Sequence, residues 1–288
     1  MTYSIVARDG QTGELGAAIQ SASFGCGVST LYAESGVGIV ATQSFTDPGY
    51  GPLCLASMRF GATPAEALAG STARDRLVDF RQVGVVSSSG VAAAHTGRLC
   101  IDHAGHVTAE NVACQANMMD GPSVWPAMLQ AFSESPGRLS ERLMRALEAA
   151  QAEGGDWRGQ EAGRVLVVEA EPTGRPWDDV VCDVRVDNHP QPVAELGRLV
   201  ARSEALRAAQ HPQGRSVAEA VELARESGLE ESRVVLAALA AARNGGDVEE
   251  ARAHLDRLLE VEPRYLDMVR RLPGMADMLG LDPGSPEM

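Results

Sequence analysis

The sequence predicts an α+β fold: two antiparallel sheets pack against each other between outer helix layers, an αββα sandwich, and a small all-helical domain follows. Two observations lead to this prediction. Groups of strands alternate with pairs of helices over residues 1–210, whereas a doubly wound sheet would separate single parallel strands by single helices. From residue 216 to about residue 281 the chain is rich in Ala, Glu, Arg and Leu, with helical spacing. We therefore place the domains at residues 1–210 and 211–288.

The individual elements follow from local pattern. Strands are expected at residues 3–8, 15–21, 37–43, 82–87, 91–95, 164–169 and 180–186, with shorter extended pieces between 99 and 117. Helices are expected at residues 53–60, from 63 onward, and at 123–133, 139–152 and 193–209. Turn-forming residues at 9–14 join the first two strands into a hairpin. Thr63, Pro64 and Glu66 form a capping box that starts a helix.

The composition excludes several kinds of partner. A formal charge of −14 and a pI near 4.9 would repel nucleic acid and anionic membrane surfaces. All 25 basic residues are arginines, so no lysine is available as a catalytic base. Five widely spaced cysteines without a CxxC pair indicate free thiols in a reducing compartment. With no signal-peptide pattern and no apolar run long enough to span a bilayer, we expect a cytoplasmic protein.

Thr2 is the strongest candidate for a catalytic residue. A small second residue usually permits removal of Met1, which would leave Thr2 with a free α-amine. Such an amine has a reference pKa of about 7.7–8.0 and could take the proton from the threonine hydroxyl at neutral pH. Thr2 also begins a strongly hydrophobic strand, which would hold the nucleophile on a rigid element.

A series of segments in this order resembles the DUF1028 family. The segments are residues 2–9 (TYSIVARD), 12–16 (TGELG), 36–43 (GVGIVATQ), 48–52 (PGYGP), 81–86 (RQVGVV), 96–97 with Cys100, 104–106 (AGH), 115–117 (QAN), 154–159 (GGDWRG) and 183–190 (DVRVDNHP). The resemblance implies the N-terminal nucleophile (Ntn) hydrolase fold and amide-bond hydrolysis through an acyl-enzyme. It also implies that the C-terminal helical part is similar to the family's peptidoglycan-binding extension, although Tyr265 is its only aromatic residue.

The resemblance implies specific residues of the catalytic site. Gln43, Gln115 and Asn117 match family positions, and their neutral amides are suited to stabilise an oxyanion. The alternative is that these amides tie loops together inside the sandwich. The chain departs from the family pattern at Ala162, where relatives have serine, and at Asp47 and Ala116, where Asn and Gly are more usual.

Four further residues are candidates for substrate binding. Asp9 could orient a substrate amine or be solvated at the hairpin turn, and Tyr50 lies in the matched 48–52 segment. Asp156 and Arg158 lie in a glycine-bounded loop, where the arginine could bind a carboxylate or the pair could brace the loop.

Other chemistries find little support. His95, Asp102, His103 and His106 do not have a zinc-site spacing. Glycine-rich stretches match no nucleotide-binding fingerprint, so no cofactor is expected. Cys26 is a conceivable nucleophile without a sequence feature that places a histidine beside it.

The sequence therefore favours a cofactor-free Ntn amidohydrolase acting on a small amide or peptide-like molecule. The alternative is a catalytically silent protein of the same fold that binds or scaffolds a partner through its helical tail. Homodimer formation stays open in both cases.

Overall fold

The computed structural model describes residues 2–210, 217–226, 228–272 and 275–280. Its contacts divide the chain into two compact units, Met1–Val200 and Ala201–Met288, and the division falls inside one helix. The sequence-based boundary after residue 210 stays a prediction, and the expected break at residues 211–214 lies outside the described residues. Within the described residues, no helix combines the length and apolar character needed to cross a membrane.

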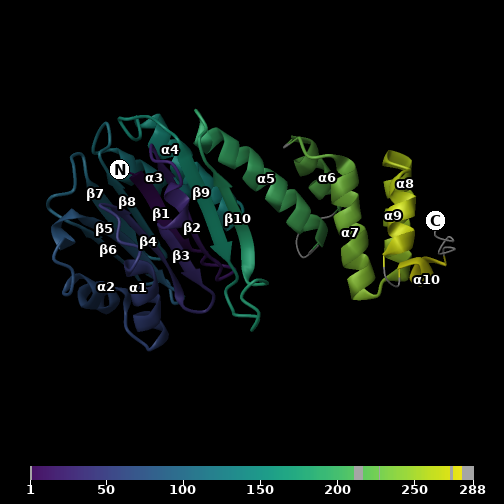
Figure 1. Ribbon diagram of the computed structural model, residues 1–288, viewed down its shortest axis with the longest axis horizontal. Coiled ribbons are helices and arrows are strands. Elements are labelled where there is room, and N and C mark those ends of the chain that lie inside the picture. Colours follow the sequence, from purple (N-terminus) through teal and green to yellow (C-terminus); the bar gives the residue numbers. More distant parts are fainter. Residues whose placement is uncertain (1, 211–216, 227, 273–274, 281–288) are drawn as a thin grey trace. The chain divides into compact units, whose positions relative to one another are not determined.

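Unit 1 contains two antiparallel sheets (Figure 1). The first has the strand order β10-β9-β2-β1-β8-β7. These strands are β1 (Thr2–Arg8), β2 (Leu15–Ser21), β7 (Gly105–Ala109), β8 (Val112–Asn117), β9 (Ala162–Val168) and β10 (Val180–Val186). The second sheet has the order β3-β4-β5-β6, formed by β3 (Leu31–Glu34), β4 (Gly38–Ser44), β5 (Arg81–Ser87) and β6 (Ala92–Thr96). The predicted hairpin is confirmed, whereas β3 was not predicted because four residues carry too little pattern.

Helices cover the outer face of each sheet. Helices α3 (Val124–Glu134) and α4 (Leu139–Ala152) pack on the first sheet, and α1 (Tyr50–Arg59) and α2 (Pro64–Thr72) pack on the second. The capping box at Thr63 is confirmed, because its side chain accepts from the Glu66 backbone N–H while Glu66 bonds back. Two short 3-10 helices, η1 (Cys26–Val28) and η2 (Val78–Phe80), lie in the connections.

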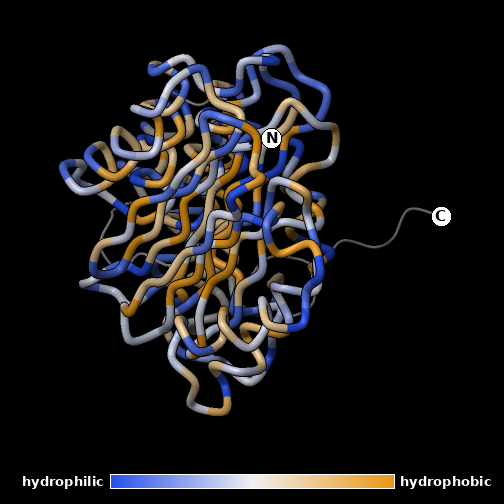
Figure 2. The backbone as a smooth tube through the Cα atoms, turned by 90° about the vertical axis from the view of Figure 1, so that its left-hand side faces the viewer, coloured by the Kyte–Doolittle hydropathy of each residue, from blue (hydrophilic) through white to orange (hydrophobic). Residues whose placement is uncertain are grey.

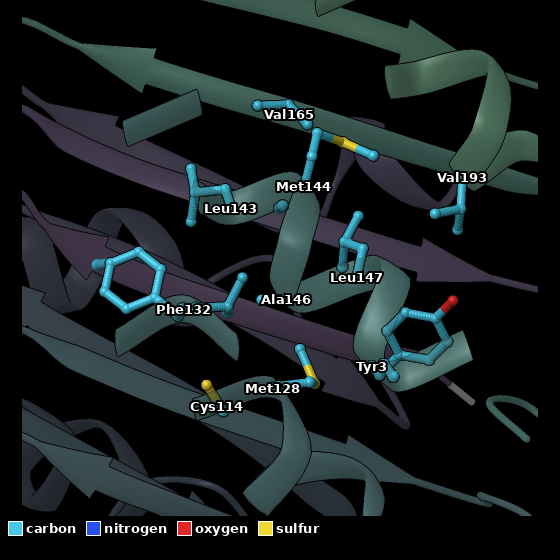
Figure 3. Packing of buried hydrophobic residues seen from close by; sticks show 14 of the residues in the cluster. Tyr3, Cys114, Met128, Phe132, Leu143, Met144, Ala146, Leu147, Val165 and Val193 are labelled. Carbon is cyan, nitrogen blue, oxygen red and sulfur yellow. The ribbon is translucent and has the colours of Figure 1, made fainter. Parts of the chain in front are cut away.

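Three hydrophobic clusters fill the layers of unit 1. One lies between the first sheet and its helices, where Tyr3, Met128 and Leu147 pack together (Figure 3). A second joins the facing sides of the two sheets, and a third lies between the second sheet and α1 and α2. In Figure 2, orange segments follow the strands and the bluest stretches lie in connecting loops. Side chains alternate along β1: Tyr3, Ile5 and Ala7 join the cluster under the helices, and Val6 joins the cluster between the sheets.

Unit 2 is entirely helical in its described residues. It contains the end of α5 (Pro192–Gln210), then α6 (Val217–Glu226), α7 (Glu231–Gly245), α8 (Val248–Val261), α9 (Tyr265–Arg271) and α10 (Met275–Leu279). Two small apolar clusters hold these helices together. The chain therefore combines a mixed unit of antiparallel sheets and helices with C-terminal helices, as the composition indicated.

Candidate functional site

Thr2 lies at the first position of β1, with its side chain in the gap between the two sheets. Its backbone is opposite Ser21 of β2 on one side and Asn117 of β8 on the other. The Thr2 hydroxyl donates to Ser21 Oγ at 3.1 Å, and only 5% of the residue is exposed. The candidate nucleophile is thus held between two neighbouring strands, at the edge of the sandwich where β1 begins.

Two of the predicted amides converge on the Thr2 backbone. Gln43 Nε2 lies 3.1 Å and Asn117 Nδ2 lies 3.4 Å from the carbonyl oxygen of Thr2. Gln43 reaches this oxygen from β4 of the facing sheet, and Asn117 reaches it from the neighbouring strand β8. The structure therefore brings Gln43 and Asn117 to Thr2, where they fix its backbone.

Gln82 of β5 connects these amides and was not among the sequence candidates. Its side-chain oxygen accepts from Gln43 Nε2 at 2.8 Å and from Asn117 Nδ2 at 2.9 Å. Its nitrogen reaches Thr96 Oγ1 and the carbonyl oxygens of Gly105 and Ala116 at 2.8–3.1 Å. The signal available in the sequence was a glutamine directly before the apolar run at residues 83–86, since an amide in a buried strand needs partners.

Gln115 lies one step deeper along the same gap. Its Nε2 donates to Ser4 Oγ at 2.6 Å, and Ser4 Oγ donates to Gln43 Oε1 at 2.5 Å. Gly84 makes room for this side chain, because a Cβ at residue 84 would come within 2.2 Å of Gln115 Oε1. Gln115 therefore belongs to the same amide cluster but supports it through Ser4 instead of contacting Thr2.

Asp156 and Arg158 lie beside the Thr2 end of the first sheet. Asp156 Oδ2 accepts from the backbone N–H of Ala22, which follows Ser21. Arg158 holds the same carboxylate, with Nη2 at 2.8 Å from Oδ2 and Nε at 3.1 Å from Oδ1. The side chain of Asp156 is fully buried. Of the two interpretations left open by the sequence, these contacts favour bracing of the loop.

Asp9 lies at the opposite end of β1 from Thr2. Seven residues of extended strand separate them, about 23 Å. Its Oδ1 accepts from the backbone N–H groups of Gln11 and Thr12, and its Oδ2 pairs with Arg142 at 3.0 Å. Burial would raise the pKa of Asp9, but these two N–H groups and Arg142 lower it overall. The structure thus places Asp9 away from Thr2, where turn geometry fixes this carboxylate, and a role in substrate binding stays a prediction.

Tyr50 is also placed away from Thr2. It lies on α1, in the cluster on the outer face of the second sheet, and its hydroxyl donates to Asp75 Oδ2 at 3.0 Å. Asp75 in turn pairs with Arg81 at 2.6 Å. Burial and the bond to Asp75 raise the pKa of Tyr50. Tyr50 therefore lies on the outer face of the second sheet, which the sequence could not show, and its role in substrate binding stays a prediction.

The remaining titratable candidates are placed as follows. His95 Nε2 lies 3.0 Å from the carbonyl oxygen of Val78, and His106 Nδ1 lies 2.8 Å from Thr96 Oγ1. Across the residues that the structure describes, no group of three or more metal-ligating side chains is suited to a metal ion. Burial and the charge of Asp187 raise the pKa of Cys26 to about 12, so its thiol stays protonated at neutral pH.

Ala162 lies at the start of β9, opposite Ser21 and fully buried. A serine at this position, which the family resemblance implies, would add a hydroxyl next to Ser21, two strands from Thr2. The departure from the family pattern thus falls within reach of the Thr2 environment.

Comparison with known proteins identifies the family. A family of unknown function, DUF1028, matches residues 2–196. The crystal structure of protein SPO2555 from Silicibacter pomeroyi, assigned to the same family, is similar, with 31% identity and a TM-score of 0.64. That match covers 70% of this chain and 85% of the other. No curated protein matches the sequence. The chain belongs to the DUF1028 family.

Proposed function

We propose that unit 1 is a four-layer αββα sandwich of the Ntn-hydrolase type, which hydrolyses a small amide or peptide-like substrate through Thr2. The observation that carries this proposal is the setting of Thr2. Its hydroxyl is paired with Ser21, and its carbonyl oxygen is held by Gln43 and Asn117. A nucleophile on a fixed backbone satisfies the positioning that such a reaction requires.

The proposed reaction uses one residue as nucleophile and base. Once Met1 is removed, the α-amine of Thr2 accepts the hydroxyl proton while Oγ1 forms a bond to the substrate carbonyl carbon. Collapse of the tetrahedral intermediate breaks the C–N bond, and the ammonium returns its proton to the leaving nitrogen. Water then attacks the ester, the same amine takes a proton from that water, and Oγ1 leaves with it to restore Thr2.

Asn117 is the proposed oxyanion donor. It lies directly opposite Thr2 in β8, and its 3.4 Å contact with the Thr2 carbonyl is at the long end for a hydrogen bond. A small rotation could aim Nδ2 at the developing negative charge. Gln43 makes shorter hydrogen bonds to the Thr2 carbonyl oxygen and to Gln82 Oε1, and it continues to hold the Thr2 backbone during the reaction.

The first experiment is intact-mass analysis of the purified protein. The proposal requires the mass of the chain without Met1, because a blocked Thr2 has no free amine. The second compares wild type, Thr2→Ala and Thr2→Ser on a panel of amides. Turnover should be lost in Thr2→Ala and largely kept in Thr2→Ser. Equal turnover in wild type and Thr2→Ala would refute a nucleophilic Thr2.

One observation favours the second candidate, a binding or scaffolding protein without catalysis. The amides around Thr2 bond to one another and to backbone, as a purely structural cluster would. On that interpretation Met1 could remain, and no substrate would depend on Thr2. The partner would then be recruited by unit 2. A peptidoglycan role for unit 2 also stays a proposal, and Tyr265, which packs partly against its apolar cluster, is a poor sugar platform.

A further inference from the structure

We infer that the substrate of Thr2 carries a bulky, uncharged apolar acyl group. This inference rests on the proposed function. It comes from an apolar rim, which we define as Phe24, Phe45, Ile101 and Trp157, whose exposed fractions are 71%, 64%, 54% and 58%. Large side chains with this much exposure on neighbouring loops mark an interaction surface.

The four residues of the apolar rim lie on loops that leave the sheets around Thr2. Phe24 follows β2, which ends at Ser21 opposite Thr2. Phe45 follows β4, where Gln43 reaches the Thr2 carbonyl. Loops from both sheets therefore carry an exposed phenylalanine at the edge where β1 begins.

The other two loops both bond to residues that follow β8, and in the loop of Trp157 the carbonyl oxygen of Gly155 accepts from the backbone N–H of Asp120. The carbonyl oxygen of Ile101 accepts from the backbone N–H of Met118, which follows Asn117. Trp157 follows Asp156, which is bonded to the backbone beside Ser21. Phe45 also lies 6.3 Å from the Phe80 ring, centre to centre, which extends the apolar surface. Each of four loops thus contributes one large apolar side chain to the apolar rim.

The charges on these loops argue against an anionic substrate. Asp47 lies on the loop of Phe45 and Asp102 on the loop of Ile101, and Asp120 lies on the loop that follows β8. The arginines on or beside these loops, Arg81, Arg98 and Arg158, are each paired with an aspartate, so their charges are already balanced. A carboxylate-bearing acyl group would meet these acids, whereas an aliphatic or aromatic group would cover apolar rim surface and gain by leaving water. The occupant that fits this edge is therefore the apolar acyl group of the Thr2 substrate.

The test compares p-nitrophenyl esters of acetic, hexanoic, phenylacetic and succinic acids, which share one leaving group. Acylation is followed by nitrophenolate release and by the mass of the Thr2 peptide, with Thr2→Ala as the background. We expect hexanoyl and phenylacetyl esters to acylate Thr2 about tenfold faster than acetyl, and the succinyl ester to be slowest. If no ester labels Thr2, the proposed function fails. If Thr2 is labelled but acetyl is equal or fastest, this inference alone fails.

A matched pair of tryptophans locates the effect. Trp157→Ser should lower the hexanoyl-to-acetyl rate ratio about threefold or more. Trp177→Ser should leave the ratio unchanged, because Trp177 is 74% exposed on the β9–β10 connection, which leaves β9 next to Leu15 at the far end of β2. Equal effects of both variants would contradict the inference. Sedimentation velocity gives a second check. A wild-type dimer that becomes monomeric in the double variant Phe24→Ser, Phe45→Ser would also contradict the inference, because a second copy of the chain would then cover the apolar rim.

Discussion

The two ends of β1 fix their polar groups in opposite ways. At the Thr2 end, the groups that bond to Thr2 itself are uncharged: the hydroxyl of Ser21 and the amides of Gln43 and Asn117, which are joined by Gln82. At the Asp9 end, an ion pair with Arg142 and two backbone N–H groups hold a carboxylate. Both ends are largely buried, so the difference lies in charge and not in exposure.

This difference has a physical reason. Uncharged amides avoid the large desolvation cost that ions would incur between two packed sheets. Asp9 meets less of that cost because it lies at a turn and three donors compensate it. The Thr2 end is arranged for positioning, and the Asp9 end braces a turn.

The largest loss of stability is expected for Gln82→Leu, at the Thr2 end. This variant leaves the amide donors of Gln43 and Asn117 without their shared acceptor inside a dry gap. We expect a loss of about 3–5 kcal/mol in the free energy of unfolding, measured with urea.

Gln20→Leu is the matched control. Gln20 is also fully buried, yet neither polar atom of its side chain has a hydrogen-bond partner in the described part of the chain. Leucine at residue 20 should cost less than about 1 kcal/mol or stabilise the protein. Similar losses of unfolding free energy for both variants would show that the hydrogen bonds of the amide cluster do not stabilise the protein.

The Asp9 end should respond less strongly. Arg142→Met keeps the aliphatic stem but removes the ion pair with Asp9 and the guanidinium 4.1 Å above the Phe132 ring. We expect a loss of about 2 kcal/mol by urea unfolding. Arg145→Met, on the exposed side of the same helix, removes only a surface pair with Glu148 and should cost under about 0.5 kcal/mol. A cost for Arg145→Met as large as that for Arg142→Met would argue against this view.

The pH dependence of stability also distinguishes the Asp9 end of β1 from the Thr2 end. The folded-state pKa of Asp9 is lowered, so its contribution is fully present above the unfolded value of about 3.9. That contribution is lost as the pH falls through the lower folded value. The stability difference between wild type and Asp9→Asn should therefore stay constant above about pH 5 and narrow as the pH falls below about 4. A difference that does not narrow as the pH falls would mean that the ionised form is not favoured by folding.

Ser21→Ala should give the smallest change. It removes the acceptor of the Thr2 hydroxyl, and we expect a loss of about 1 kcal/mol in the free energy of unfolding. Ser57→Ala, which removes an exposed hydroxyl bonded to the Leu53 carbonyl, should have a smaller effect. A Ser21 variant with unchanged stability would indicate that the hydroxyl pair does not hold Thr2.

Periodicity and turn chemistry were enough to predict most elements of unit 1. The hairpin of β1 and β2, the capping box at Thr63 and the helix pair α3 and α4 depend on neighbouring residues, which the sequence displays directly. The strand β3 escaped prediction because it is short. The family resemblance supplied Gln43, Gln115 and Asn117, which the structure gathers into one cluster near Thr2.

The sequence by itself determined the local elements, the acidic charge and the start of a buried strand at Thr2, because these properties arise from composition and near neighbours. Only the tertiary structure decided which polar groups share the gap between the sheets. It joined Gln82 to Gln43 and Asn117, and it separated Asp9 and Tyr50 from Thr2. The reason is that strand pairing and sheet packing bring together residues far apart in the chain, and no local pattern records that pairing.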